Sequence, residues 1–102
     1  MAITKEVVVD QIEATASRVI QVRFKKQVVE DGNVLSYEYH RTTLEPGVPA
    51  AEQAALVNAH LAQMGWPTVR APDIARIQAI AQVEHTPAVI AEFRARRAAR
   101  RQ

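Results

Sequence analysis

The chain has 102 residues, enough for one domain with a single core, and its formal net charge is +2. The absence of cysteine excludes disulfides, cysteine-ligated zinc, iron–sulfur clusters and thiol nucleophiles. No apolar run approaches the roughly 18 residues that a membrane helix needs, and no apolar stretch follows the opening Met1–Glu6 as in a signal peptide. We therefore expect neither a membrane span nor a secretory leader.

The net charge hides an uneven distribution. Residues 94–102 contain five arginines and no acidic residue, whereas the other 93 residues carry 8 basic and 11 acidic side chains. A mildly acidic body therefore ends in a strongly basic segment.

Composition also changes near residue 49. Residues 1–49 contain 9 valines and 3 alanines, and residues 50–102 contain 4 valines and 15 alanines. Valine favours strands and alanine favours helices. We therefore predict an α+β fold: a β-meander over 1–45 and helices over 49–93 form a single domain, and 94–102 form an arginine-rich helix end or tail.

The clearest local signal is a hairpin. Residues 19–29 and 34–42 both alternate apolar and polar side chains, and Asp31-Gly32 between them suits a type I′ turn. A turn at Gly32-Asn33 would shift the pairing by two residues and keep the same faces, so the exact turn stays open.

An Asp31-Gly32 turn makes a definite prediction about register. It places Val28 opposite Leu35 and Phe24 opposite Tyr39, so that Leu35, Tyr37 and Tyr39 lie on the apolar face.

Residues 6–13 predict a third strand, which completes a three-stranded antiparallel meander. Such a sheet needs cover on its apolar face. The run Val7-Val8-Val9 places branched apolar side chains on both faces of this outer strand. We interpret this as a sign of an oligomer or a docked partner, with Val7 and Val9 as candidate partner-binding residues.

Two or three helices are expected to cover the sheet. The first runs from Pro49 to about Met64, the second opens at Pro72-Asp73, and the third restarts at Thr86-Pro87 with Thr86 as its cap. Their inward positions are predicted to be Leu56 or Val57, Leu61 and Met64, then Ile74, Ile77, Ile80, Ala81 and Val83, then Val89, Ile90 and Phe93.

The histidines do not predict a metal site. His40, His60 and His85 lie 20 and 25 residues apart in three different elements, whereas metal ligands commonly share one helical turn or short loop. We expect each to be a surface or capping residue.

No catalytic motif is present either. Glu38 and His40 point the same way from one strand and could form an acid–base pair, but cross-strand ion pairing with Arg23 or Lys25 is the simpler interpretation. There is no Gly-x-Ser-x-Gly motif and no glycine-rich phosphate loop. The sequence thus predicts a non-enzyme without catalytic residues, cofactor or metal.

The basic segment supplies the remaining candidate partner-binding residues: Arg94, Arg96, Arg97, Arg100 and Arg101. They could form a solvated helix end, bind an acidic protein surface, or neutralise nucleic-acid phosphates. Nucleic acid is the least favoured, because no aromatic residues interleave with these arginines.

Several motifs together resemble small uncharacterised proteins encoded in the structural gene clusters of tailed bacteriophages, among the tail and host-recognition genes. The motifs are Thr4–Glu13 followed by Val19–Arg23, Glu30-Asp31-Gly32, Tyr39-His40-Arg41 with Leu44–Gly47, and Arg76–Ile80 leading to His85–Ile90. The resemblance covers most of the chain outside residues 49–72. There this sequence carries an additional helical segment with Trp66, which we include among the candidate partner-binding residues.

The resemblance implies a structural virion component of the tail, baseplate or fibre-attachment region. Such a protein would be assembled in the host cytoplasm, in several symmetry-related copies, and would act through protein–protein contacts. It transfers no catalytic residue. The alternative is a small module that binds nucleic acid or a host factor through the arginine-rich C-terminus.

Overall fold

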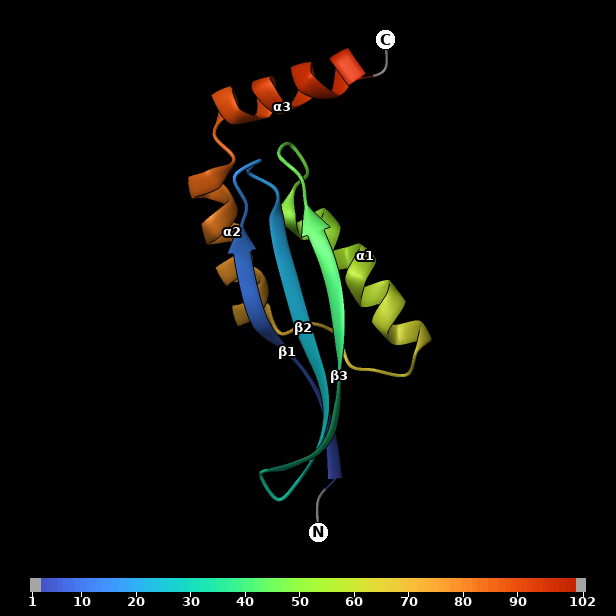
Figure 1. Ribbon diagram of the computed structural model, residues 1–102. Coiled ribbons are helices and arrows are strands. Elements are labelled where there is room, and N and C mark those ends of the chain that lie inside the picture. Colours follow the sequence, from blue (N-terminus) through green and yellow to red (C-terminus); the bar gives the residue numbers. More distant parts are fainter. Residues whose placement is uncertain (1–2, 101–102) are drawn as a thin grey trace.

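The computed structural model describes residues 3–100 and has six elements in chain order. They are β1 (Ile3–Ala14), β2 (Ile20–Glu30), β3 (Asn33–Leu44), α1 (Ala50–Gln63), α2 (Ala71–Glu84) and α3 (Pro87–Arg100). The strands form one antiparallel sheet in the order β1-β2-β3, and three helices follow (Figure 1). The predicted α+β fold is confirmed.

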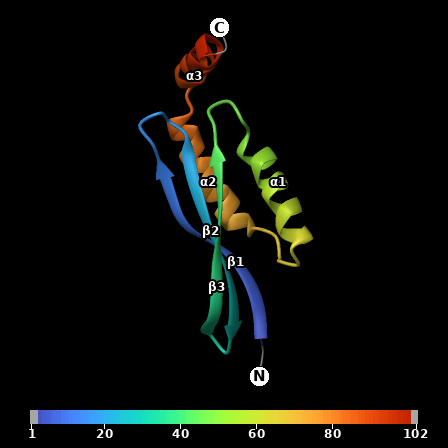
Figure 2. The same ribbon diagram turned by 45° about the vertical axis from the view of Figure 1, so that its right-hand side comes forward.

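Within the described residues, helices cover one face of the sheet and leave the other uncovered. Helices α1 and α2 lie side by side against the covered face (Figures 1 and 2). α1 runs along β3, and α2 runs along β1. Helix α3 lies beyond the end of the sheet where β1 turns into β2. The opposite end, with the β2–β3 hairpin, projects past the helices, which gives the molecule its extents of 57 × 25 × 20 Å. We call the uncovered side the open face.

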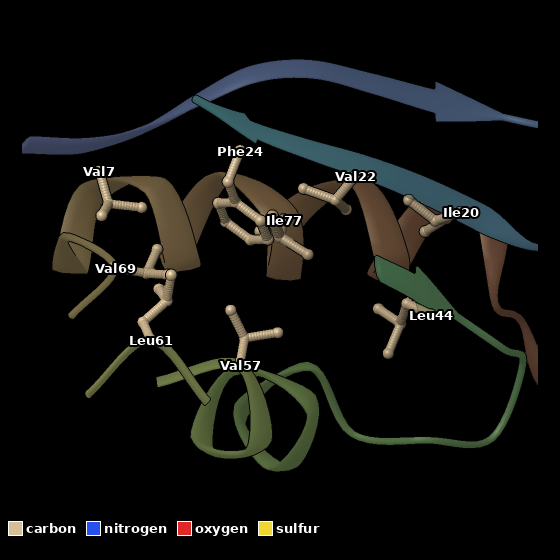
Figure 3. Close-up of a cluster of buried hydrophobic side chains, with 9 residues drawn as sticks. All are labelled: Val7, Ile20, Val22, Phe24, Leu44, Val57, Leu61, Val69 and Ile77. Carbon is tan, nitrogen blue, oxygen red and sulfur yellow. The ribbon is translucent and has the colours of Figure 1, made fainter. Parts of the chain in front are cut away.

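The core lies between β2 and the helix pair α1–α2 (Figure 3). Phe24 is 2% exposed at its centre, and α1 and α2 contribute the buried Val57, Leu61 and Ile77. Its other members are Val7, Ile20, Val22, Leu44 and Val69.

Of the two hairpin turns that the sequence left open, the structure has the one at Asp31-Gly32, but the register predicted from that turn is wrong. Glu30 pairs with Asn33, so Asp31 and Gly32 form the turn, with positive φ angles of 49° and 83°. Val29 then pairs with Val34, but Val28 pairs with Ser36. One residue of β3, Leu35, is therefore extra, which makes a β-bulge.

This bulge reverses the faces of the rest of β3. Phe24 lies opposite His40 instead of Tyr39, and Lys25 lies opposite Tyr39. Because side chains alternate with a period of two, one inserted residue moves every following side chain to the other face. Tyr37 and Tyr39 therefore lie on the open face, 53% and 41% exposed, and not in the predicted apolar layer. Leu35 is also exposed.

The helices begin and end within a few residues of the prediction. The predicted cap is confirmed, because the Val89 N–H donates to Thr86 Oγ1 at 3.3 Å. Of the alternatives Leu56 and Val57, Val57 is the buried one. Two predicted inward side chains are instead exposed: Met64, and Val83 at 74%. Val83 follows the buried Ile77 by six residues, which places it about 120° around the helix, away from the sheet.

Candidate interaction surface on the open face of the sheet

Alternation along β2 decides which side chains reach the open face. Val22 and Phe24 are buried against the helices, so Arg23 and Lys25 point the other way. Their neighbours across the ladders share that face. β1 contributes Glu6, Val8, Asp10, Gln11 and Glu13, and β3 contributes Tyr37, Tyr39, Arg41 and Thr43.

Two exposed tyrosines are held in place by two cations. The Arg23 guanidinium carbon lies 4.3 Å from the Tyr39 ring centroid, and Lys25 Nζ lies 4.5 Å from that of Tyr37. The two rings lie 5.4 Å apart at 60°, and Arg23 Nε also donates to Asp10 Oδ2 at 2.7 Å. Each cation–π contact contributes about 0.5–1 kcal/mol at an exposed site. The aromatic rings are therefore accessible yet positioned, as anchors of an interface commonly are.

The charges of this face are separated by strand. All the acidic groups, Glu6, Asp10 and Glu13, lie on β1, while the basic groups Arg23, Lys25 and Arg41 lie on β2 and β3. Within residues 3–100 the exposed Arg41 has no ion-pair partner. A hollow of about 720 Å³ lies on the same face, lined chiefly by Gln11, Glu13, Gln21, Arg23, Arg41 and Thr43.

Residues 94–100 of the predicted arginine-rich segment form the second half of α3, which continues past Phe93 to Arg100. Arg97 Nη1 pairs with Glu45 Oε2 at 2.8 Å, and Arg96 pairs with Glu92 one turn earlier on α3. Both pairs are exposed, where an ion pair contributes about 0–1 kcal/mol.

The other predicted arginines differ in their surroundings. The guanidinium of Arg94 lies against Gly47, where an added Cβ would be 3.1 Å from Arg94 Nη2. Arg100 is exposed, and Arg101 lies outside the described residues. Arg94 and Arg97 thus contact the β3–α1 loop, Arg96 pairs within α3, and Arg100 is left for solvent or a partner.

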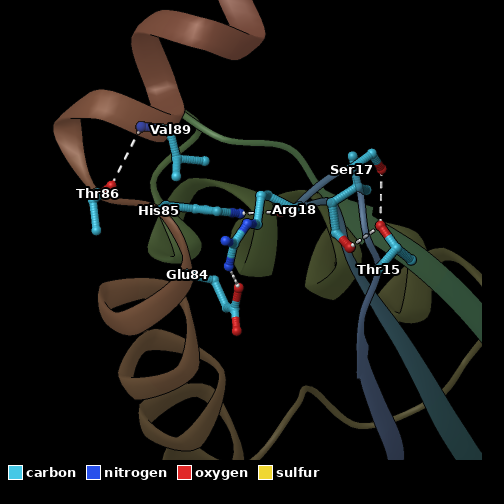
Figure 4. A network of polar contacts seen from close by, with 8 residues as sticks. Thr15, Ser17, Arg18, Glu84, His85, Thr86 and Val89 are labelled. Atoms are coloured by element: carbon cyan, nitrogen blue, oxygen red, sulfur yellow. Dashed lines mark hydrogen bonds and ion pairs between the residues drawn. The ribbon is translucent and has the colours of Figure 1, made fainter.

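The junction before α3 is fixed by polar contacts to the β1–β2 turn (Figure 4). Arg18 Nη1 donates to Glu84 Oε2 at 2.8 Å, and the Arg18 carbonyl lies 2.7 Å from His85 Nε2. The backbone N–H of His85 donates to Ala81 O at the end of α2. His85 is therefore a capping residue, as predicted.

Val7, Val9 and Trp66 have core positions and do not lie on the open face. Val7 is 1% exposed, and Val9 and Trp66 are half-buried against the core cluster. Val8 is the member of the valine run that points to the open face. Val7 and Val9, which the sequence predicted to contact a partner, thus pack into the core between the sheet and the helices of the same chain.

Trp66 packs beside two lysines on the covered face. Lys5 Nζ lies 5.3 Å and Lys26 Nζ 5.7 Å from the Trp66 ring centroid. Lys26 is 5% exposed, and its Nζ lies 3.5 Å from Glu38 Oε2. Glu38 thus pairs with Lys26, because the bulge turns Glu38 to the covered face.

The predicted pairing of Glu38 with Arg23 or Lys25 is therefore wrong. Arg23 pairs with Asp10 instead, and Lys25 lies over Tyr37.

Packing of α1 against β3 brings two histidines together, which sequence spacing did not indicate. The rings of His40 and His60 lie 5.1 Å apart. Burial lowers the pKa of His40 from its usual value of 6.5, and the nearby His60 and Lys26 lower it further. Across residues 3–100 no group of three or more His, Cys, Asp or Glu side chains is placed to hold a metal ion.

No helix among the described residues is both long and apolar enough to cross a membrane. Comparison of the chain with protein-family models, curated proteins and solved structures gives no match.

Proposed function

We propose that the chain is a small, non-catalytic structural component that acts through protein–protein contacts, with the open face as its main contact surface. One observation carries the proposal: the sheet presents two exposed, cation-held tyrosines on a face that no described element covers. Tyrosine and arginine are enriched at the anchoring points of protein interfaces. Three long strands with one uncovered face resemble one sheet of a β-sandwich, in which a second sheet packs on that face.

The phage-like motifs support a particular setting for this contact surface. In that setting the chain is a virion protein of the tail, baseplate or fibre-attachment region, present in several copies. The motifs coincide with elements that build the scaffold: β1, the Asp31-Gly32 turn, and the junction from His85 to Ile90.

The protein composition of purified particles tests this setting, with the chain expected among the particle proteins. A pull-down with the wild-type chain and the variant Tyr37→Ala/Tyr39→Ala tests the surface. We expect the variant to lose its particle partners while it keeps its fold by circular dichroism. A chain that is missing from particles and binds no particle protein would contradict the proposal.

A second candidate function is single-stranded nucleic-acid binding. The open face itself supports it, because Tyr37 and Tyr39 beside Arg23, Lys25 and Arg41 combine stacking surfaces with cations. Binding of a single-stranded DNA at two salt concentrations tests it. Loss in Tyr37→Ala/Tyr39→Ala would assign binding to the sheet.

The same DNA-binding experiment also tests the arginines of α3. Loss of binding in a variant with Arg96, Arg97 and Arg100 changed to glutamine, with a steep salt dependence in the wild type, would assign binding to α3. Wild-type protein that does not bind DNA at the lower salt concentration would exclude this function.

A further inference from the structure

We propose that the open face binds a second copy of this chain, face to face, about a two-fold axis that runs parallel to the strands over β2. The inference rests on the proposed function, since it takes the open face to be a protein-contact surface. It identifies the first partner as the chain itself and defines the geometry of the contact.

The register of the sheet divides the open face into three levels. At the first level, Arg23 lies between Gln11 on β1 and Arg41 on β3. Asp10 lies beside Gln11 in a β-bulge. At the next level, Lys25 lies between Val8 and Tyr39.

At the third level, Gln27 lies between Glu6 and Tyr37 and donates to Glu6 Oε2 at 2.9 Å. Each level thus has a β1 residue on one side and a β3 residue on the other.

A two-fold rotation parallel to the strands exchanges the two sides and keeps the levels. Arg41 of one copy then lies over Asp10 of the other, Tyr39 over Val8, and Tyr37 over Glu6. The first contact is an ion pair and the second is apolar. In the third, the tyrosine phenol can donate a hydrogen bond to the carboxylate. Each contact occurs twice, as an isologous interface requires.

Charge selects this axis over the other two-fold axis in the plane of the sheet. An axis perpendicular to the strands would place β1 over β1, with acidic residues facing acidic residues, and β3 over β3, with its basic Arg41 over the same strand. β2 lies over β2 about either axis, so the two flanking strands are what distinguish the arrangements. Like charges placed opposite each other suppress the perpendicular arrangement. Packed sheets lie about 10 Å apart, which leaves room for the tyrosine and arginine side chains. Their strand directions differ by about 30°, so the axis bisects the β2 directions of the two copies.

The unpartnered atoms of the face agree with this pairing. Arg41 has no ion-pair partner within residues 3–100, and both contacts of Arg23 to Asp10 use Oδ2. Among the described contacts, Oδ1 of Asp10 is therefore left for the Arg41 of a second copy. β2 lies on the axis, so Arg23 and Lys25 each face their own counterpart in the second copy. Arg23 pairs with Asp10 of its own chain, and Lys25 lies over the ring of Tyr37.

Sedimentation equilibrium of the full chain at moderate salt tests the proposal. We expect a wild-type dimer. Arg41→Glu should weaken it at least tenfold, because the new carboxylate would meet Asp10. Gln11→Arg should also weaken it, because a second cation would meet Arg41. The double variant Gln11→Arg/Arg41→Glu should regain the dimer.

Arg76→Glu is the matched control, since Arg76 is exposed on α2, on the opposite side of the sheet. It makes the same charge change and should leave the dimer intact. Circular dichroism checks that every variant keeps its fold.

A wild-type monomer at all concentrations would overturn the inference. So would equal weakening by Arg41→Glu and Arg76→Glu, or failure of the double variant to regain the dimer. A monomer that still captures particle proteins through Tyr37 and Tyr39 would overturn the dimer alone and leave the proposed function standing. A dimer that captures no particle protein would overturn the proposed function and leave the dimer standing.

Discussion

Phe24 lies opposite His40 in the β2–β3 ladder, and their ring centroids are 6.3 Å apart. This pairing is a direct result of the bulge at Leu35, which shifts the rest of β3 by one residue. It gives the covered face a histidine where an unbroken alternation would put Tyr39. It also gives the open face two tyrosines, on which both the proposed function and the dimer depend.

Truncation of Phe24 and of Tyr39 should have very different effects on stability. Phe24→Ala removes a 2% exposed core ring and should lower the free energy of unfolding by about 3–5 kcal/mol. Tyr39→Ala removes an exposed ring with one cation–π contact and should cost about 1 kcal/mol or less. Urea unfolding at a concentration where the protein is monomeric measures both. Equal losses would mean that the unbroken register is correct.

Stability should fall as the pH drops below the unfolded-state pKa of histidine, near 6.5. The folded state lowers the pKa of His40, so the unfolded chain binds more protons in the range just below 6.5 and gains free energy there relative to the folded chain. The stabilisation is therefore fully present above pH 6.5 and is lost as pH falls through the folded pKa.

Urea unfolding at pH 7.5 and 5.5 checks this pH dependence. His40→Gln should show a smaller difference between the two pH values than the wild type. His85→Gln, which removes a histidine at the α2 end, serves as the comparison and should leave the contribution of His40 in place. An unchanged difference in His40→Gln would contradict the assignment.

Replacing Lys26 by methionine should leave stability unchanged or raise it. Lys26 is 5% exposed, and its carboxylate neighbour Glu38 is largely in solvent, so its charge is buried with incomplete compensation. Methionine has a similar length and keeps the packing against Trp66. An NMR titration of Lys26→Met should also show a higher pKa for His40, because one of the cations that lowers it is gone. A lower His40 pKa would refute this account.

Loss of the α3 cap should loosen α3 without unfolding the protein. Thr86→Ala removes the acceptor for the Val89 N–H, a change that costs about 1 kcal/mol of helix stability. Because α3 has no buried residue, this loss should be local. Hydrogen exchange should speed up in α3 alone. A comparable speeding in β2 would show that α3 is coupled to the core.

The sequence alone determined the elements and their order. Valine alternation, the Asp31-Gly32 turn, and the proline and threonine at the start of α3 are local signals, because each acts within a few residues of backbone. They predicted three strands, two or three helices and the Thr86 cap.

Tertiary structure decided which faces these elements present. A single bulge residue, Leu35, has no compositional signal, yet it exchanges the two faces of β3 because strand side chains alternate with a period of two. The contacts of His40 with His60 and of Lys26 with Trp66 join residues 20 and 40 positions apart, so only the packing of helices on the sheet brings them together. Local pattern thus predicts the elements, and long-range packing determines which side chains remain exposed for a partner.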